Sequence, residues 1–239
     1  MIRTVRSCLL GGLIFGSALP GAAEEYPGTP PSSGPVITIR VYDYTALRNS
    51  VKKRAQAEAD RIFGKAGVKT EWAACPISKE TLPGDPPCHE SPSTTDIRLN
   101  ILTAGMTRKI TTDHSTFGAA FPLKDGFGSL AIVFAERVRE LAASHGAPEG
   151  LLLGHFITHE IGHLLLGLNS HSDAGIMRVP WNRAQIERAH LGTLLFAEHE
   201  AEQMQRHASA RLGARTARPE VELPRAAAEN ATGMPWPRR

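Results

Sequence analysis

The sequence is poor in cysteine and nearly balanced in charge. Its 239 residues include three cysteines, and the formal net charge is only +3. So small a charge does not indicate binding to nucleic acid or to a membrane surface, and we expect no nucleic-acid partner. The sequence also lacks an internal repeat and an Asp-rich loop that resembles a calcium site. A hydrophobic content of 41% is sufficient for a core, so we expect one folded, monomeric domain with disordered ends.

No apolar run near the N-terminus is long enough for a confident membrane span. The run Cys8–Leu19 is broken by glycine and falls short of the roughly 20 residues that a spanning helix needs. Arg3 and Arg6 precede it and Gly21-Ala22-Ala23 follow it, which is typical of a secretory signal peptide over residues 1–23. A retained N-terminal anchor is the alternative. The pattern predicts a secreted or periplasmic protein with no stable membrane span after signal removal.

Signal removal would leave two cysteines, because Cys8 lies in the cleaved segment. Cys75 and Cys88 enclose a loop rich in Pro and Gly, and their C-x12-C spacing is a poor zinc motif. An oxidising compartment favours disulfides. We therefore predict a Cys75–Cys88 disulfide, which would stabilise the fold by about 3 kcal/mol through restriction of the unfolded chain.

The mature chain divides by composition into three parts. Residues 24–35 are rich in Pro, Gly and Ser, as expected of a linker. From Gly213 onward the sequence shows no hydrophobic period, which predicts a disordered tail over residues 213–239. The folded domain is therefore expected over residues 36–212.

Hydrophobic periodicity in this domain predicts an α/β fold. Alternating or short apolar runs predict strands over residues 36–44, 68–75, 96–103, 117–121 and 129–135. Apolar stripes of helical spacing predict helices over residues 45–63, 136–144, 148–166, 182–191 and 198–212, with Gly64 ending the first. The initial βαββ order suggests a mixed, twisted sheet with a crossover helix. The last two helices suggest a small helical C-terminal lobe.

The helix predicted over residues 148–166 carries a metal-binding pattern, His159-Glu160-Ile161-Gly162-His163. Residues four apart lie on one face of a helix, so His159 and His163 can both direct a ring nitrogen at one tetrahedral Zn²⁺ ion. Glu160 points to the side, where it can accept a proton from a zinc-bound water whose pKa is lowered to about 7. The alternative is a buried amphipathic helix whose histidines are only hydrogen-bonded.

A third ligand is expected from the segment that follows this helix. Gly167 can end the helix in a left-handed conformation and return the chain, so that His171 reaches the zinc. His155 lies about 12 Å along the helix from His163, too far for both to bind one ion through bonds of about 2.0–2.1 Å. We interpret His155 as a packed or supporting residue. Asp173 is the alternative third ligand, and weaker ones are Glu187 and Glu198.

These residues resemble the zinc motif of metzincin metallopeptidases, in particular the matrixin branch. That family reads H-E-x-x-H-x-x-G-x-x-H and continues into a Met-turn beneath the zinc. This chain reads H-E-x-x-H-x-x-x-G-x-x-x-H, followed by Ser172 to Met177. One extra residue therefore stands on each side of Gly167, and the added helical residue rotates the helix exit by about 100°. The resemblance implies a zinc peptidase in which Met177 packs below the metal.

The resemblance extends to a short strand of small residues that ends in Phe-Pro. It implies a sheet edge that pairs with an extended peptide substrate, whereas an ordinary hairpin is the alternative. Pro180-Trp181 would form part of a wall beside the substrate pocket. Arg178 and Val179 follow Met177, so no tyrosine donor is expected there. The residues of the strand are Phe117, Gly118, Ala119, Ala120 and Phe121.

The favoured hypothesis is a secreted or periplasmic zinc endopeptidase that acts on peptides or proteins, with Glu160 as general base. A zinc-binding exported protein without peptidase activity, such as an interaction module, is the alternative. A metal-free helical scaffold is the third possibility. The geometry of His159, His163 and His171 discriminates among them: converging nitrogens with an open fourth position favour an enzyme, and diverging nitrogens favour a scaffold.

Overall fold

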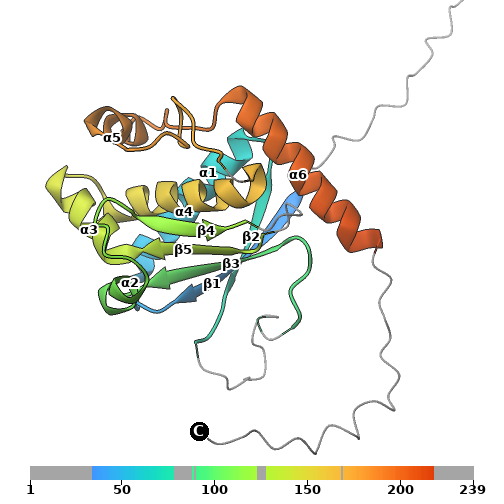
Figure 1. Ribbon diagram of the computed structural model, residues 1–239, viewed down its shortest axis with the longest axis horizontal. Helices are drawn as coiled ribbons and strands as arrows, with labels where there is room; N and C mark the ends of the chain where they lie inside the picture. Colours follow the sequence, from blue (N-terminus) through green and yellow to red (C-terminus); the bar gives the residue numbers. More distant parts are fainter. Residues whose placement is uncertain (1–33, 78–87, 89, 123–127, 168, 218–239) are drawn as a thin grey trace, which may run out of the picture. The chain divides into compact units, whose positions relative to one another are not determined.

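Figure 1 shows the computed structural model of the chain. The structure describes residues 34–77, 88, 90–122, 128–167 and 169–217. The predicted signal peptide, nearly all of the linker and residues 218–239 of the predicted tail lie outside the described residues. In the described part of the chain, no helix combines the length and the apolar character needed to cross a membrane.

A five-stranded mixed sheet lies at the centre of the fold, with strand order β2-β1-β3-β5-β4 (Figure 1). Four strands run parallel, and β4 pairs antiparallel with β5. The edge position of β4 agrees with the prediction from the sequence. The strands are β1 (Val36–Asp43), β2 (Lys69–Ala74), β3 (Asp96–Leu102), β4 (Gly118–Phe121) and β5 (Leu130–Phe134).

α1 and α4 cover one face of this sheet, whereas Met106 of α2 packs with Ile132 and Phe134 on the other face. α1 is the crossover between the parallel strands β1 and β2, and α4 packs against α1, β4 and β5. α6 contacts α4 and β1, and α5 contacts α4, so the predicted C-terminal helices are present. The predicted α/β fold is confirmed. The helices are α1 (Asn49–Lys65), α2 (Ala104–Ile110), α3 (Ala135–Ser144), α4 (Glu149–Leu166), α5 (Arg183–His190) and α6 (Glu198–Ala217).

The core lies between the sheet and the helices α1 and α4. Alternate strand residues such as Ile37 and Ile39 point into it, because successive side chains of a strand project to opposite faces. α1 and α4 approach so closely that a Cβ added to Gly154 would lie 2.6 Å from the carbonyl oxygen of Ala55. α4 is buried along almost its whole length. The His159–His163 segment therefore lies on a firmly held helix.

The first helix differs from its predicted limits at both ends. It begins at Asn49 rather than Thr45, because the Asp43 carboxylate accepts hydrogen bonds from the Thr45 N–H and hydroxyl and from the Leu47 N–H. These bonds hold the segment in a turn. The helix also continues through Gly64, so the predicted stop at Gly64 is wrong. α1 ends at Lys65 with Ala66 as its C-cap, and Gly67 follows with a φ of +73° that suits glycine.

Two further helix limits differ from the expectation. α6 continues to Ala217, so the tail boundary placed at Gly213 is too early. α2 was not predicted at all, although Thr103 caps it by accepting a hydrogen bond from the Met106 N–H. The predicted disulfide is present: Cys75 and Cys88 are bonded, with Cα atoms 5.5 Å apart.

Candidate metal centre

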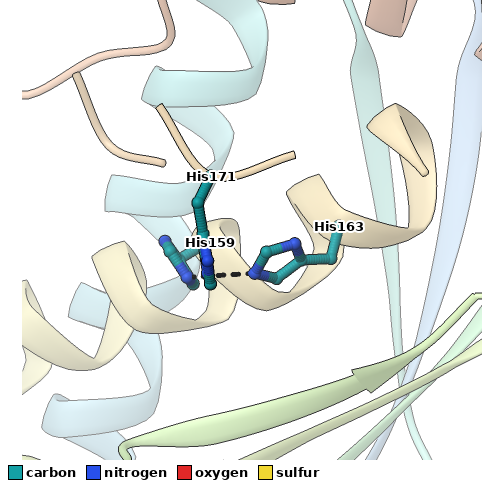
Figure 2. Close-up of side chains that lie close together, drawn as sticks. All are labelled: His159, His163 and His171. Atoms are coloured by element: carbon teal, nitrogen blue, oxygen red, sulfur yellow. Dashed lines mark hydrogen bonds between the residues drawn. The ribbon is translucent and has the colours of Figure 1, made fainter. Parts of the chain in front are cut away.

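Three histidines come together at the side of α4 (Figure 2). His159 and His163 belong to α4, and His171 follows in the returning loop. One ring nitrogen from each lies within 4.8 Å of the others, and no other group of three His, Cys, Asp or Glu side chains in the described residues is placed to hold a metal in this way. The alternative ligands Asp173, Glu187 and Glu198 are outside this group.

His159 and His163 are spaced as two ligands of one ion. Their Nε2 atoms are 3.2 Å apart. A tetrahedral zinc ion with Zn–N bonds of about 2.0–2.1 Å would separate two nitrogens by about 3.3–3.4 Å. The pair therefore needs almost no rearrangement to bind zinc.

The second ring nitrogen of each histidine is also held. His159 Nδ1 lies 2.8 Å from the carbonyl oxygen of Ile176. Because a carbonyl can only accept, Nδ1 carries the proton and Nε2 keeps a free lone pair. His163 Nδ1 lies 2.8 Å from the hydroxyl of Ser170. Both rings are thus oriented with Nε2 towards a common point.

Burial keeps these two histidines neutral. Burial lowers the pKa of His159 to about 4. The hydrogen bond to the Ile176 carbonyl raises this pKa and the nearby His171 lowers it, but both effects are smaller than that of burial. Burial, followed by the neighbouring His159 and His171, lowers the pKa of His163 to about 3. Neutral imidazole is the form that binds a metal ion. Both side chains are ready to act as ligands at neutral pH.

His171 reaches the pair although the loop is longer than in the metzincin motif. Gly167 and Asn169 adopt φ values of +93° and +59°, which turn the chain back towards the helix. The His171 ring centroid is 4.7 Å from that of His163 and 5.6 Å from that of His159. One ring nitrogen of His171 lies within 4.8 Å of a nitrogen of each helix histidine, which makes His171 the third candidate ligand.

Met177 lies in a tight turn that packs against α4. The turn is closed by a bridge between Ser172 and Arg178 and by the hydrogen bond from the Ser172 N–H to the Met177 carbonyl oxygen. Met177 is fully buried. A Cβ added to Gly162 would lie 2.8 Å from its sulfur, so the sulfur contacts the helix next to His163. The turn thus supports the helix segment that carries the histidines.

Glu160 lies beside the histidines, pressed against the edge strand. Its side chain is buried, and burial raises the pKa of its carboxyl to about 8. A cation held by the histidines would lower this pKa again. A Cβ added to Gly118 would lie only 2.5 Å from Glu160 Oε1. The glycine in β4 is therefore what allows the carboxyl group to lie against the strand.

A cleft of about 660 Å³ opens beside Glu160 and the three histidines. One side is formed by β4 and the residues before it, and the other by Val179, Pro180 and Trp181. Three aromatic rings connect these sides: Phe156 of α4 stacks on Phe117 at 4.6 Å and on Trp181 at 4.5 Å between centroids. The post-Met177 segment thus forms a wall of the cleft.

The backbone of β4 presents hydrogen-bonding groups at the edge of the sheet. The Phe134 N–H donates to the Phe117 carbonyl oxygen, so this pair is hydrogen-bonded. Bonded and non-bonded pairs alternate along an antiparallel ladder, and Gly118 pairs with Val133 in the next position. Gly118 and Ala120 therefore direct their N–H and C=O groups away from β5. No strand in the described residues pairs with that side.

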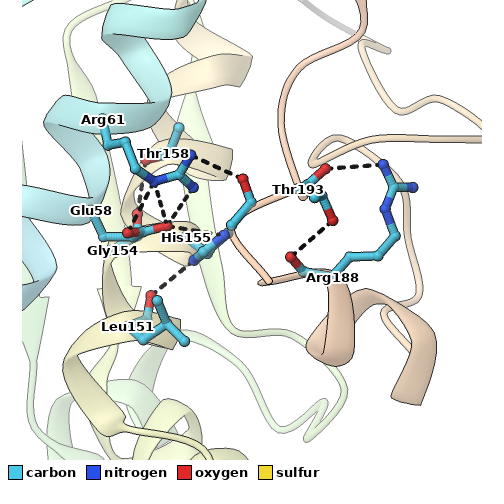
Figure 3. Close-up of polar contacts among 9 residues, drawn as sticks. Glu58, Arg61, Leu151, Gly154, His155, Thr158, Arg188 and Thr193 are labelled. Carbon is cyan, nitrogen blue, oxygen red and sulfur yellow. Dashed lines mark hydrogen bonds and ion pairs between the residues drawn. The ribbon is translucent and has the colours of Figure 1, made fainter. Parts of the chain in front are cut away.

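His155 takes no part in the metal centre. It is fully buried, its Nδ1 lies 2.9 Å from the Leu151 carbonyl oxygen, and its Nε2 lies 3.5 Å from Glu58 of α1 (Figure 3). Glu58 also pairs with Arg61, which donates to the Gly192 carbonyl oxygen. Burial lowers the pKa of His155. It acts as a packed residue between α4 and α1.

Two residues that contact the site or its flanking segment belong to no motif in the sequence. Ser170 contacts His163, and its place directly before His171 was a usable signal. Arg137 of α3 is buried and donates hydrogen bonds to the carbonyl oxygens of Thr111, Asp113 and Thr116, in the segment that leads into β4. Nothing in the local sequence of Arg137 indicated this role.

Known proteins give little guidance on this chain. No protein-family model matches it, and no curated protein matches it. Among solved structures, it is similar to the crystal structure of archaemetzincin from Methanopyrus kandleri, with a TM-score of 0.40 and 20% sequence identity, covering 76% of this chain and 99% of that one. A similarity at this level identifies no family and carries no activity across.

Proposed function

We propose that the chain is a zinc-dependent endopeptidase of metzincin type, with His159, His163 and His171 as ligands and Glu160 as general base. The observation that carries this proposal is the convergence of three histidine nitrogens beside a buried carboxyl group, in a cleft bordered by a sheet edge. Zinc in such a site would lower the pKa of a coordinated water and polarise the substrate carbonyl.

Glu160 would carry the proton during hydrolysis. It would accept a proton from the attacking water and then deliver it to the leaving amine. Its position supports this role, because the carboxyl group lies both beside the histidines and against Gly118 of the edge strand. A peptide held along that strand would pass close to the carboxyl group.

The substrate would be an extended peptide or protein segment. The N–H and C=O groups of Gly118 and Ala120 would pair with it as an added strand, and Pro180 and Trp181 would bound it on the other side. Met177 would serve as the packing support of a Met-turn, as the matrixin-type motif implies. The fully buried sulfur against Gly162 supports that assignment.

We also propose that the protein is exported to a secreted or periplasmic location and acts as a monomer. The N-terminal signal pattern and the Cys75–Cys88 disulfide support export, since disulfides persist in oxidising compartments. Mass spectrometry of the protein recovered outside the cytoplasm should give a chain that begins near residue 24. Recovery of the uncleaved chain from the cytoplasm alone would contradict export.

A zinc-binding protein without peptidase activity is the second candidate. The observation in its favour is that His171 is exposed and lies in a loop longer than that of the metzincin motif. Such a site could bind zinc strongly through His159 and His163 and weakly through His171, without the geometry needed for hydrolysis.

One experiment separates these candidates. The mature protein is analysed for bound metal and incubated with a peptide library, alongside the Glu160→Gln variant. We expect one zinc per chain in both proteins, and cleavage by the wild type only. Zinc without cleavage in either protein would favour the non-catalytic candidate, and the absence of zinc from both would refute the metal site.

A further inference from the structure

The supports of the two helix ligands differ in chemistry. His159 Nδ1 is bonded to a backbone carbonyl, which can only accept and so fixes the tautomer that leaves Nε2 free. His163 Nδ1 faces the Ser170 hydroxyl, which can accept or donate. For His163 to offer Nε2 to a metal, Nδ1 must carry the proton and the hydroxyl must accept it. The support of His163 is therefore a side chain that mutation can remove.

Ser170 also stands immediately before the third histidine. It lies in the loop between Gly167 and His171, the same loop that is longer than in the metzincin motif. The contact between Ser170 and His163 fixes the loop on α4 one residue before His171. The same contact thus orients one ligand and limits where the next can lie.

We propose that Ser170 is a positioning residue of the metal centre, which orients His163 through Nδ1 and anchors the loop that delivers His171. This inference rests on the zinc site of the proposed function, but not on peptidase activity. Groups that hydrogen-bond a metal-bound histidine commonly contribute about 10–100-fold to metal affinity. Ser170 should therefore affect zinc binding even if the protein cleaves no peptide.

The test compares zinc affinities by competition with a chromophoric chelator, in full-length mature protein. Ser170→Ala should weaken zinc binding by about 10–100-fold. Ser170→Thr keeps the hydroxyl, so its zinc affinity should stay close to that of the wild type. Ser170→Val has nearly the shape of the threonine variant but no hydroxyl, so its zinc affinity should fall as in the alanine variant. The Thr and Val pair keeps the test valid if alanine perturbs the loop.

Ser144 provides a matched control. Its hydroxyl lies 2.9 Å from Nδ1 of His145, a serine–histidine contact of the same kind at the end of α3. Ser144→Ala should leave zinc affinity unchanged. Cobalt(II) substitution adds a second readout, because its visible spectrum reports coordination geometry: the spectrum should change in the Ala and Val variants and remain in the Thr variant.

The possible outcomes separate the two proposals. If the wild type binds zinc and the Thr and Val variants bind it equally, the hydroxyl has no positioning role and this inference is wrong, while the zinc site stands. If the wild type binds no zinc, both proposals fall. An equal loss of affinity in Ser144→Ala and Ser170→Ala would also overturn the inference, since the effect would not be local.

Discussion

Replacement of Gly118 by alanine should disable hydrolysis without removing the metal. The added Cβ would lie 2.5 Å from Glu160 Oε1 and 2.6 Å from both Cδ and Cγ. Ordinary van der Waals contact begins near 3.4 Å. Either the carboxyl group or the edge strand must therefore retreat by about 1 Å, and a misplacement of about 1 Å can cost about 100-fold in rate.

We expect kcat/KM of Gly118→Ala to fall by about 100-fold, which corresponds to about 2.7 kcal/mol in activation free energy. The φ angle of Gly118 is not in the left-handed region, so alanine fits the strand backbone and the fold should persist. The three histidines keep their positions, so zinc content should remain that of the wild type. The assay is steady-state cleavage of a peptide found by library screening, with metal analysis of the same samples.

The matched control is Gly64→Ala in α1, where an added Cβ meets no atom within 4 Å. Alanine is favoured over glycine in a helix by up to about 1 kcal/mol, so this variant should be fully active and no less stable. Gly118→Ala with wild-type kcat/KM and full zinc would refute the idea that Glu160 is the general base held against β4.

The other predictions concern the metal, the disulfide and a buried histidine. His171→Ala should abolish tight zinc binding, whereas Glu160→Gln should keep zinc and lose about 10²–10⁴-fold in turnover; tight zinc binding by the His171 variant would exclude it as a ligand. Joint replacement of Cys75 and Cys88 by serine should lower the free energy of unfolding by about 3 kcal/mol in urea titrations. Burial lowers the pKa of His155 in the folded protein, so His155 takes up a proton more readily in the unfolded chain. The free energy of unfolding should therefore decline as the pH falls below about 6.5. His155→Gln should make this decline shallower in metal-free protein, and an unchanged slope would contradict the assignment.

The sequence was informative where structure depends on local pattern. Pro148 and the long apolar segment around His159 predicted α4 almost to the residue, and helical spacing alone placed His159 and His163 on one face. Alternation along β1 and β3 predicted the buried strands in the same way. These features depend on neighbours within one or two turns of the chain, which a single sequence displays.

The remaining features depend on partners far apart in the chain. The contact of Gly118 with Glu160 and the bond of His159 to the Ile176 carbonyl arise only after the sheet and the returning loop are assembled. α1 begins late because Ala46 adopts a left-handed φ of +52° and Arg48 an extended conformation, while the Asp43 carboxylate holds the Thr45 and Leu47 N–H groups in a turn. Helical periodicity does not reveal such a turn.

The stacked rings of Phe117, Phe156 and Trp181 beside the cleft include a tryptophan whose fluorescence can report on the site. Trp181 is stacked on Phe156, and its ring lies 6.3 Å from that of His159. Trp72 lies in β2, at the opposite edge of the sheet, with its indole N–H bonded to Asp60. Metal or peptide entering the cleft should therefore change the emission of Trp181 and leave that of Trp72 unaltered. Adding metal or peptide to the unlabelled protein while recording tryptophan emission would therefore follow occupation of the site in real time. The Trp181→Phe variant is the control, because its emission should not respond.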